Sequence, residues 1–324
     1  MELFNPNANI NFMGWRKVSL AISCLLMILS AGVIFVRGLD YGLDFTGGAL
    51  VEVVYQEPAE VADVRSALTA AGFENPVVQS LGGTREFAIR FAPREDEAAA
   101  EGAEATASQA AHNRIANDVL SALKAGRSDV AIKRSEFVGP QVGEELRTDG
   151  LIAVIVVALG IAVYLWIRFE WRFAVAAVAS EMHDALLTLG IFALTQREFD
   201  LPALAAVLSV VGYSINDKIV VFDRVREIFR STRKAEPIEV LNRSINSTMS
   251  RTIMTGVTTA LAVGTLYFLG GPVLENFGLI MLIGIFIGIL SSIFFANPIL
   301  LMLGVSKKDL MPVTREDPEL ARRP

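Results

Sequence analysis

The stretch that decides the fold is LPALAAVLSVVGYSINDKIVVF, at residues 201–222. It is long enough to cross a hydrocarbon core about 30 Å thick, because an α-helix needs roughly 20 mostly apolar residues to do so. It contains Asp217 and Lys218, and a charged side chain at bilayer depth costs about 2.5 to 3.5 kcal/mol on insertion scales. An acid placed between two apolar runs predicts a functional membrane helix, in which the acid has a partner or takes up a proton.

Five further stretches approach the same length, so the sequence predicts six membrane helices. The chain of 324 residues is 52% hydrophobic and has a mean hydropathy of +0.46, which is too apolar for an ordinary soluble fold. The predicted spans are 18–36, 151–167, 173–194, 201–222, 253–269 and 277–303.

Basic residues near the ends of the spans predict the orientation. Arg16 and Lys17 precede the first span, and the tail from residue 306 begins with two lysines. The connections 168–172 and 223–250 are also basic, whereas 195–200 holds one arginine and 270–276 holds no positive charge. We therefore predict that both termini are cytoplasmic and that residues 38–149 lie on the opposite side.

Charge and motif content exclude several other classes of protein. A formal net charge of -6 gives no basic field, which excludes nucleic acid as a partner. The single cysteine, Cys24, cannot form a disulfide within the chain, and its apolar surroundings predict that it is buried. The sequence has no zinc-protease helix motif, phosphate loop or dinucleotide fingerprint, so we expect no enzyme activity, cofactor or metal.

The connection 38–149 is long enough to form a domain of its own. Alternating apolar residues predict strands, and apolar residues at helical spacing predict helices, in the order βαββαβ of a ferredoxin-like fold. The predicted strands are 50–55, 76–81, 86–91 and 130–138, and the predicted helices are 58–71 and 108–124. An acidic, alanine-rich stretch at about 93–106 predicts a flexible insert. The domain order is thus 1–37, 38–149, 150–305 and 306–324.

Glu181, His183 and Asp184 stand near the middle of the third span, where ionisable side chains point to function. Residues three apart share a helix face, so we expect Glu181 and Asp184 to line one pathway and His183 to project elsewhere. The alternative is that these polar groups only hydrogen bond between helices and fix the packing.

Arg251 at the start of the fifth span is the candidate partner of Asp217. Thr255 and Thr258 follow at helical spacing and would form with Arg251 a polar stripe that faces Asp217. Asn216 and Thr255 join the polar residues of the third span as candidates for a polar pathway. A carboxylate with a movable cationic partner can bind and release protons, because arginine stays charged throughout. The alternatives are an ion pair that only fixes helix packing, or an Arg251 that extends to the membrane surface.

Six motifs in this order resemble the SecD/SecF family of bacterial protein export proteins across nearly the whole chain. They are NFMGWRK at 11–17, GLDFTGG at 42–48, VGPQVGEEL at 138–146, His183-Asp184, GYSINDKIVVFDRVRE at 212–227 and NSTMSRT at 246–252. By motif position, the resemblance implies that Asp217 and Arg251 act in proton passage. Lys218 departs from the small polar residue that the family pattern has at that position.

The resemblance implies half of a transporter of the resistance-nodulation-division type in the bacterial inner membrane. The implied partners are SecD, which supplies six more spans, the SecYEG channel, the exported polypeptide, membrane lipid, protons and YajC. The implied function is late-stage export driven by the proton-motive force. Two alternatives remain open, namely a scaffold that only holds SecD at the channel, and an independent small-molecule proton antiporter.

The GLDFTGG motif leads into the first strand of the predicted outer domain. Gly47 and Gly48 are expected to form a tight turn that Asp44 caps or braces. A structural role for this turn is favoured over contact with the exported polypeptide.

Overall fold

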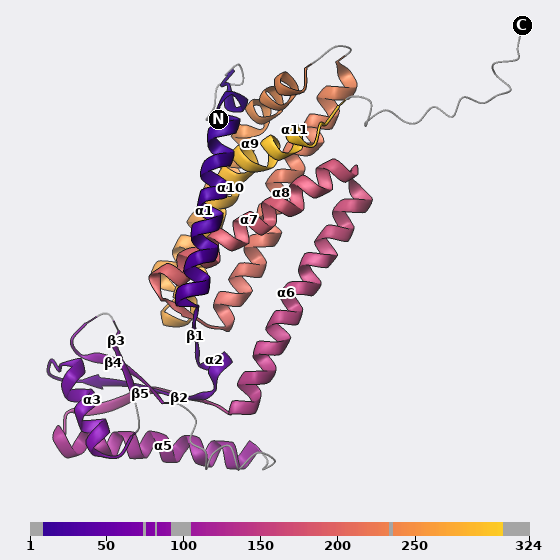
Figure 1. The fold of residues 1–324 in the computed structure, drawn as a ribbon. Coiled ribbons are helices and arrows are strands. Elements are labelled where there is room, and N and C mark those ends of the chain that lie inside the picture. The colour runs from indigo at the N-terminus through magenta and orange to yellow at the C-terminus, as the bar shows by residue number, and fades with distance from the viewer. Residues whose placement is uncertain (1–8, 74–75, 82, 92–104, 233–235, 307–324) are drawn as a thin grey trace, which may run out of the picture. The chain divides into compact units, whose positions relative to one another are not determined.

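The protein is described by a computed structural model that covers residues 9–73, 76–81, 83–91, 105–232 and 236–306 (Figure 1). The chain forms two compact units. The membrane unit comprises the chain up to Asp40 and from Val154 onward, and the second unit comprises Tyr41–Ala153. Most of the expected insert at 93–106 and the tail after Ser306 lie outside the described residues.

Within the described residues, six helical segments are long and apolar enough to cross a membrane, as predicted. They are α1 (Arg16–Arg37), α6 (Pro140–Arg168), α7 (Trp171–Thr195), α8 (Leu201–Ser231), α9 (Pro237–Leu269) and a sixth segment built from α10 (Pro272–Ser291), η2 (Ser292–Ala296) and α11 (Asn297–Met302). A short 3-10 helix, η1 (Phe12–Trp15), precedes α1, and the two-residue strands β1 (Asp40–Tyr41) and β6 (Glu198–Phe199) follow α1 and α7. The helices α8 and α9 extend well beyond their apolar stretches, because polar residues continue each helix past its apolar turns.

The membrane unit has an inner and an outer set of helices. In their apolar 18-residue windows, α7 and the sixth span are 56% buried inside the protein, whereas the spans that contain α1 and α6 are 6% buried. In Figure 1, α1 runs alongside α7 and α10 runs alongside α8. The prediction that Cys24 is buried is wrong, because α1 presents that face outward. Apolar side chains remain exposed there because lipid, not protein, is their solvent.

The sixth span contains a break in its regular hydrogen bonding. Five residues, Ser292–Ala296, form a π-helix just before Pro298. Proline lacks the backbone donor that an α-helix interior needs, and its ring crowds the preceding turn, so regular α-helix cannot run through this point. The amide of Asn297 donates a hydrogen bond of 2.6 Å to the carbonyl of Ser292, which satisfies an acceptor in this irregular turn.

The second unit is a four-stranded antiparallel sheet with two helices, and the predicted order βαββαβ is confirmed. Its elements are β2 (Gly48–Tyr55), α3 (Val61–Ala70), β3 (Val77–Ser80), β4 (Glu86–Phe91), α5 (Ala105–Gly126) and β5 (Val130–Val138). The strands lie in the order β3-β4-β2-β5. Alternate residues of β2, such as Val51, Val53 and Tyr55, pack against α3 and α5, which cover one face of the sheet (Figure 1).

Candidate functional site

Lys218 lies at the centre of a buried polar cluster between α7 and α8. Its side chain is 0% exposed. Its Nζ donates hydrogen bonds to Glu181 Oε1 at 2.7 Å, to Asp184 Oδ2 at 2.7 Å and to Ser214 Oγ at 2.6 Å. An ammonium group has three protons to donate, so every donor of Lys218 is used.

Asp184 is surrounded by donors from three helices. Its Oδ2 accepts hydrogen bonds from Lys218, from Ser214 Oγ at 2.6 Å and from Ser291 Oγ of α10 at 2.7 Å. Its Oδ1 lies 2.8 Å from Nδ1 of His183. A carboxylate offers about four lone-pair positions, so these contacts satisfy an ionised Asp184 within the bundle.

His183 joins the same cluster, although helical spacing alone placed it on another side of α7. Its Nδ1 contacts the carboxylate of the next residue, Asp184. Its ring stacks on Phe295 of η2, with ring centroids 4.2 Å apart. The structure therefore brings together all three predicted residues of the third span. The π-helix supplies one wall of the cluster.

Two atoms of the cluster keep unused hydrogen-bonding capacity. Glu181 Oε2 and His183 Nε2 are buried and have no hydrogen-bond partner among the described residues. His183 and Ser291 also line an apolar groove of about 770 Å³ between α1, α7 and α10, whose walls include Ile22 and Phe286. Glu181 Oε2 and His183 Nε2 are the two open atoms of the cluster, and its other polar side-chain atoms are hydrogen bonded to protein side chains.

The structure does not bring Asp217 and Arg251 together. Asp217 is 3% exposed, and no hydrogen bond or ion pair joins it to another described residue. Arg251 is exposed and likewise has no such partner within the described ranges. The expected polar stripe of α9 is turned outward, since Thr255 is half-buried, Thr258 is exposed and both hydroxyls donate to carbonyls of their own helix. Asn216 is exposed on α8.

Ion pairs fix the end of the bundle where α6, α7 and α8 meet. Arg168 donates to both carboxylate oxygens of Asp223 at 3.0 Å. Arg226 donates to Glu170 in the α6–α7 connection at 3.2 Å and also pairs with Asp223. This network explains the run of acidic and basic residues that follows the apolar part of α8, and it holds the base of the helix that carries Asp217 and Lys218.

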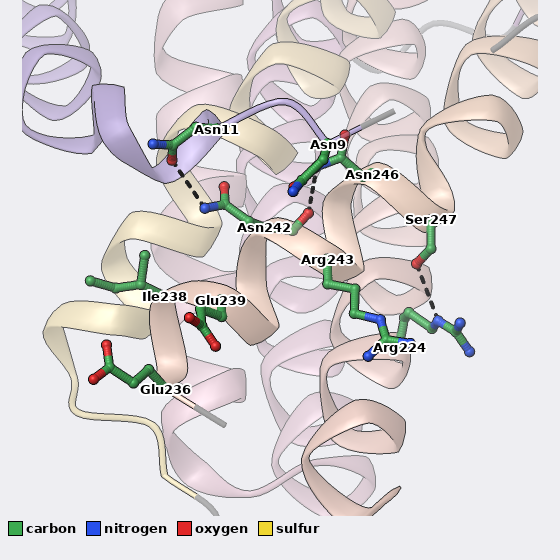
Figure 2. A pocket seen from close by; sticks show the side chains of 10 residues that line it. All are labelled: Asn9, Asn11, Arg224, Glu236, Ile238, Glu239, Asn242, Arg243, Asn246 and Ser247. Atoms are coloured by element: carbon green, nitrogen blue, oxygen red, sulfur yellow. Dashed lines mark hydrogen bonds between the residues drawn. The ribbon is translucent and has the colours of Figure 1, made fainter. Parts of the chain in front are cut away.

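The segment before α1 is clamped onto α9 by two asparagines. The amide of Asn242 accepts from Met13 N at 2.9 Å and donates to Asn11 Oδ1 at 3.0 Å, while Asn246 exchanges two hydrogen bonds with the backbone of Ile10. Figure 2 shows this contact beside a polar hollow of about 870 Å³, where Arg224 of α8 donates to Ser247 of α9. The NFMGWRK motif and the residue before it are thus held against α9, at Asn242 and at Asn246, the first residue of the NSTMSRT motif.

The double glycine forms the expected tight turn in the second unit. Gly47 and Gly48 have positive φ angles of 67° and 115°, and Gly47 N donates to the carbonyl of Leu43 at 2.9 Å. Asp44 lies in the first turn of α2 (Leu43–Thr46). A Cβ at Gly143, near the start of α6, would come within 2.8 Å of Gly47 N. The VGPQVGEEL motif therefore packs directly on the double glycine.

Reasoning from the sequence missed the central place of Lys218 and the part of Ser214 and Ser291. The sequence did contain a signal for Lys218 and Ser214, because these two residues are four apart and share a face of α8. Glu181 and Asp184 share a face of α7, and a buried lysine is the natural neutralising group for two buried acids. Ser291 had no such signal, since its contact with Asp184 depends on how α10 packs.

Comparison with known proteins places this chain in a family. The model of "Protein export membrane protein SecD/SecF, C-terminal" matches residues 118–306, and that of the "SecD/SecF GG Motif" matches residues 32–59. The chain is 43% identical over 308 residues to the protein translocase subunit SecF of Pseudomonas aeruginosa, covering 95% of this chain and 96% of the relative. It is 40% identical to the SecF of Vibrio alginolyticus, covering 100% of this chain and 99% of the relative.

Solved structures give the same result. The crystal structure of SecDF from Thermus, titled a translocon-associated membrane protein, aligns with a TM-score of 0.80 and 38% identity over 93% of this chain. A structure of SecDF in a super-membrane-facing form aligns with a TM-score of 0.66 over 92% of this chain. In both, this chain spans 39% of the SecDF chain. The chain belongs to the SecD/SecF family of protein export membrane proteins, and within that family to the SecF protein translocase subunits.

Proposed function

We propose that this chain is the proton-coupled SecF subunit of a Sec translocase, which acts with SecD to promote the late stage of polypeptide export through SecYEG. The observation that carries the proposal is Asp217, an acid 3% exposed within a membrane helix and without an ion-pair partner among the described residues. A buried acid of this kind is costly to keep ionised, and proton uptake relieves that cost. Family membership supplies the translocase context.

The proposed cycle uses the charge of Asp217. As a carboxylate, Asp217 attracts Arg251 on α9, and as a neutral acid it does not, so proton uptake and release change how α8 and α9 pack. Asn216 and Thr255, together with the His183 and Glu181 cluster, are the polar groups available to extend the pathway. A proton crossing the membrane supplies about 2.3 kcal/mol per 100 mV, which can shift a two-state equilibrium only through the difference in stability between the states.

The outward position of Arg251 suits a site that is completed by a second subunit. The SecDF relatives contain much more chain than this one, and the outer surfaces of α6 and α9 expose large apolar side chains such as Trp166, Leu261 and Phe268. We assign SecD to part of this surface and lipid to the rest. YajC is a further partner that the family suggests.

The orientation follows from the basic residues. With Arg16, Lys17 and the ion-pair network around Arg168 on the cytoplasmic side of the inner membrane, both termini are cytoplasmic and the ferredoxin-like unit is periplasmic. There the unit is placed to hold an emerging polypeptide. The rigid turn at Gly47 and Gly48, packed against Gly143, transmits helix movement into β2.

The test is Asp217→Asn in the assembled complex with SecD, reconstituted in proteoliposomes with the translocation channel. We expect proton flux under an imposed gradient and late-stage export to fall to background while recovery of the complex is unchanged. The matched control is Glu227→Gln, an acid on the same helix whose side chain is 64% exposed, which should retain flux. Normal flux and export in the Asp217 variant contradict the proposal, and loss of complex recovery alone supports the scaffold function instead.

A further inference from the structure

The buried cluster on α7 and α8 has an unbalanced charge. Glu181 and Asp184 each carry one negative charge when ionised, Lys218 carries one positive charge and His183 is neutral in its uncharged form, which leaves a net charge of about -1. These side chains are between 0 and 7% exposed. Because an uncompensated buried charge costs several kcal/mol, the cluster is more stable with one additional proton.

Two members of the cluster are poor acceptors for that proton. Lys218 already donates all three of its ammonium protons. Asp184 receives hydrogen bonds from Lys218, Ser214 and Ser291 on one oxygen and faces His183 with the other. Protonating Oδ2 would break one of its three contacts, and a proton on Oδ1 would require Nδ1 of His183 to act as the acceptor in place of donating. These two residues form a fixed ion pair at the centre.

Glu181 is placed differently. Its Oε1 accepts one hydrogen bond from Lys218, and its Oε2 is buried with no partner among the described residues. A proton on Oε2 neutralises the cluster and breaks none of its contacts. His183 Nε2 is the other open atom, but it is buried, and the residue lines the apolar groove beside α1, so a charged imidazolium would lose hydration there.

From this geometry we infer that Glu181 is a second proton-binding site of the chain, and that Lys218, held by Asp184, is the positioning residue that sets its proton load. The inference rests on the proposed proton-coupled function and extends it to a site that is separate from Asp217 and Arg251. Lys218 thereby gains a role on α8 that the family resemblance did not assign to it.

The surroundings of Glu181 contain few other charges. On α8 the nearby charged groups are Lys218 and its neighbour Asp217, and on α7 they are Asp184 and His183. Within the described ranges, α10 and η2 contribute Ser291 and Phe295 to the cluster, and neither is charged at neutral pH. The proton load of Glu181 is therefore set by these four groups.

The cluster also has a route to helix movement. Loss of the proton from Glu181 strengthens its attraction for Lys218 and weakens the hold of Lys218 on Asp184 and Ser214. A Cβ at Gly288 would lie 2.7 Å from Ser214 Oγ, so α10 packs directly on this serine. A displacement of Ser214 therefore also displaces the sixth span at Gly288, just before its π-helix.

The experiment is infrared difference spectroscopy of the full chain with its SecD partner in lipid nanodiscs, recorded as the pH is changed. We expect a carbonyl stretch from a protonated buried carboxyl that disappears in Glu181→Gln and persists in Asp217→Asn. Glu181→Asp, which keeps the acid, should shift this stretch without removing it. A stretch that survives unchanged in Glu181→Gln overturns the inference.

Lys218 is tested by the pH dependence of the same carbonyl stretch. Lys218→Met leaves Glu181 and Asp184 buried without a cation, so we expect the Glu181 stretch, identified by its loss in the double variant Lys218→Met with Glu181→Gln, to persist to higher pH than in the unmodified chain. A Glu181 stretch that disappears at the same pH in both proteins overturns the role of Lys218. The two proposals separate cleanly, because loss of flux in Asp217→Asn with an unchanged Glu181 signal supports the proposed function while rejecting only this second site.

Discussion

Asp217 and Lys218 are neighbours on α8, yet their surroundings differ. Lys218 is fully enclosed, with all of its donors used by Glu181, Asp184 and Ser214. Asp217 is nearly as buried but has no hydrogen bond or ion pair with any described residue. Successive residues of a helix point in different directions, so one helix can carry a closed polar cluster and an open acid one residue apart.

This difference suggests a division of labour. The fully hydrogen-bonded pair of Lys218 and Asp184 specifies one arrangement of α7, α8 and α10, and within their cluster only Glu181 and His183 keep an open atom among the described residues. An unsatisfied acid is more stable in some other arrangement or protonation state, and such a group can respond to a gradient.

The largest effect is expected for Lys218→Met. Removing the cation leaves Glu181 and Asp184 buried together, and breaking a buried ion pair by deleting one partner costs about 3 to 5 kcal/mol. We expect a large fall in the unfolding temperature of the chain in detergent at neutral pH. The loss should shrink at acid pH, because protonation neutralises the remaining acids.

The matched comparison for this prediction is Asp217→Asn. It removes the charge of an acid that makes no ion pair with the described residues, so the unfolding temperature should stay the same or rise slightly. If the two variants are destabilised equally, the distinction between the closed cluster and the open acid is wrong.

An intermediate effect is expected for Gly288→Ala on α10. The added methyl group would lie 2.7 Å from Ser214 Oγ, and that hydroxyl is held in place by Lys218 and Asp184. Overpacking of this kind typically costs about 1 to 3 kcal/mol. Chemical unfolding in detergent measures the loss.

Gly212→Ala on α8 is the control for the glycine prediction. Apart from its chain neighbours and the nearby backbone of its own helix, no atom of the described residues lies within 4 Å of a Cβ built at Gly212, and alanine favours helix over glycine by about 1 kcal/mol. The substitution should be neutral or slightly stabilising. A loss as large as that of Gly288→Ala would mean that the cluster does not depend on this close helix approach.

The smallest effect is expected in the second unit, where Arg127 and Asp129 form an ion pair near the surface. The hydrogen bond from Arg127 lowers the pKa of Asp129 below its ordinary value of 3.8. A lowered pKa in the folded state means that the pair stabilises the fold above about pH 4 and loses this contribution as the pH falls through the lowered pKa. Surface pairs contribute little, so the effect on stability should be slight.

Nuclear magnetic resonance of labelled aspartate carboxyls checks this pH dependence. In the unmodified chain the Asp129 carboxyl should titrate below 3.8, and in Arg127→Gln its midpoint should move up toward that value. An unchanged midpoint would show that the hydrogen bond to Arg127 is not the cause of the shift.

Much of the fold could be predicted from the sequence because the signals are local. Each membrane span is predicted by the length of its apolar run, and the alternation of apolar and polar residues at 50–55 and 86–91 indicates strands. The π-helix at Ser292–Ala296 could not be predicted in this way, because it depends on how Asn297 and Pro298 satisfy one irregular turn within a packed bundle.

The candidate site was predictable in part. Glu181 and Asp184 were expected to share a face, and the structure places them on one lysine. The burial of Lys218 was missed because it depends on the pairing of α7 with α8, which no single helix reveals. The role of Asp217 with Arg251 stays a prediction, since the two residues are not in contact in this conformation.

The central claim is that the protonation of Asp217 changes the packing of α8 and α9. It is tested most directly by pulsed electron resonance distances between spin labels at two exposed positions outside the proposed pathway, Ser209→Cys on α8 and Val257→Cys on α9, in a Cys24→Ser background with a cysteine-free SecD partner in nanodiscs. We predict that the distance distribution moves between acid and alkaline pH, and that Asp217→Asn fixes it in the acid form. A distribution that is unaffected by pH, or that moves equally in the Asp217→Asn chain, would contradict the account.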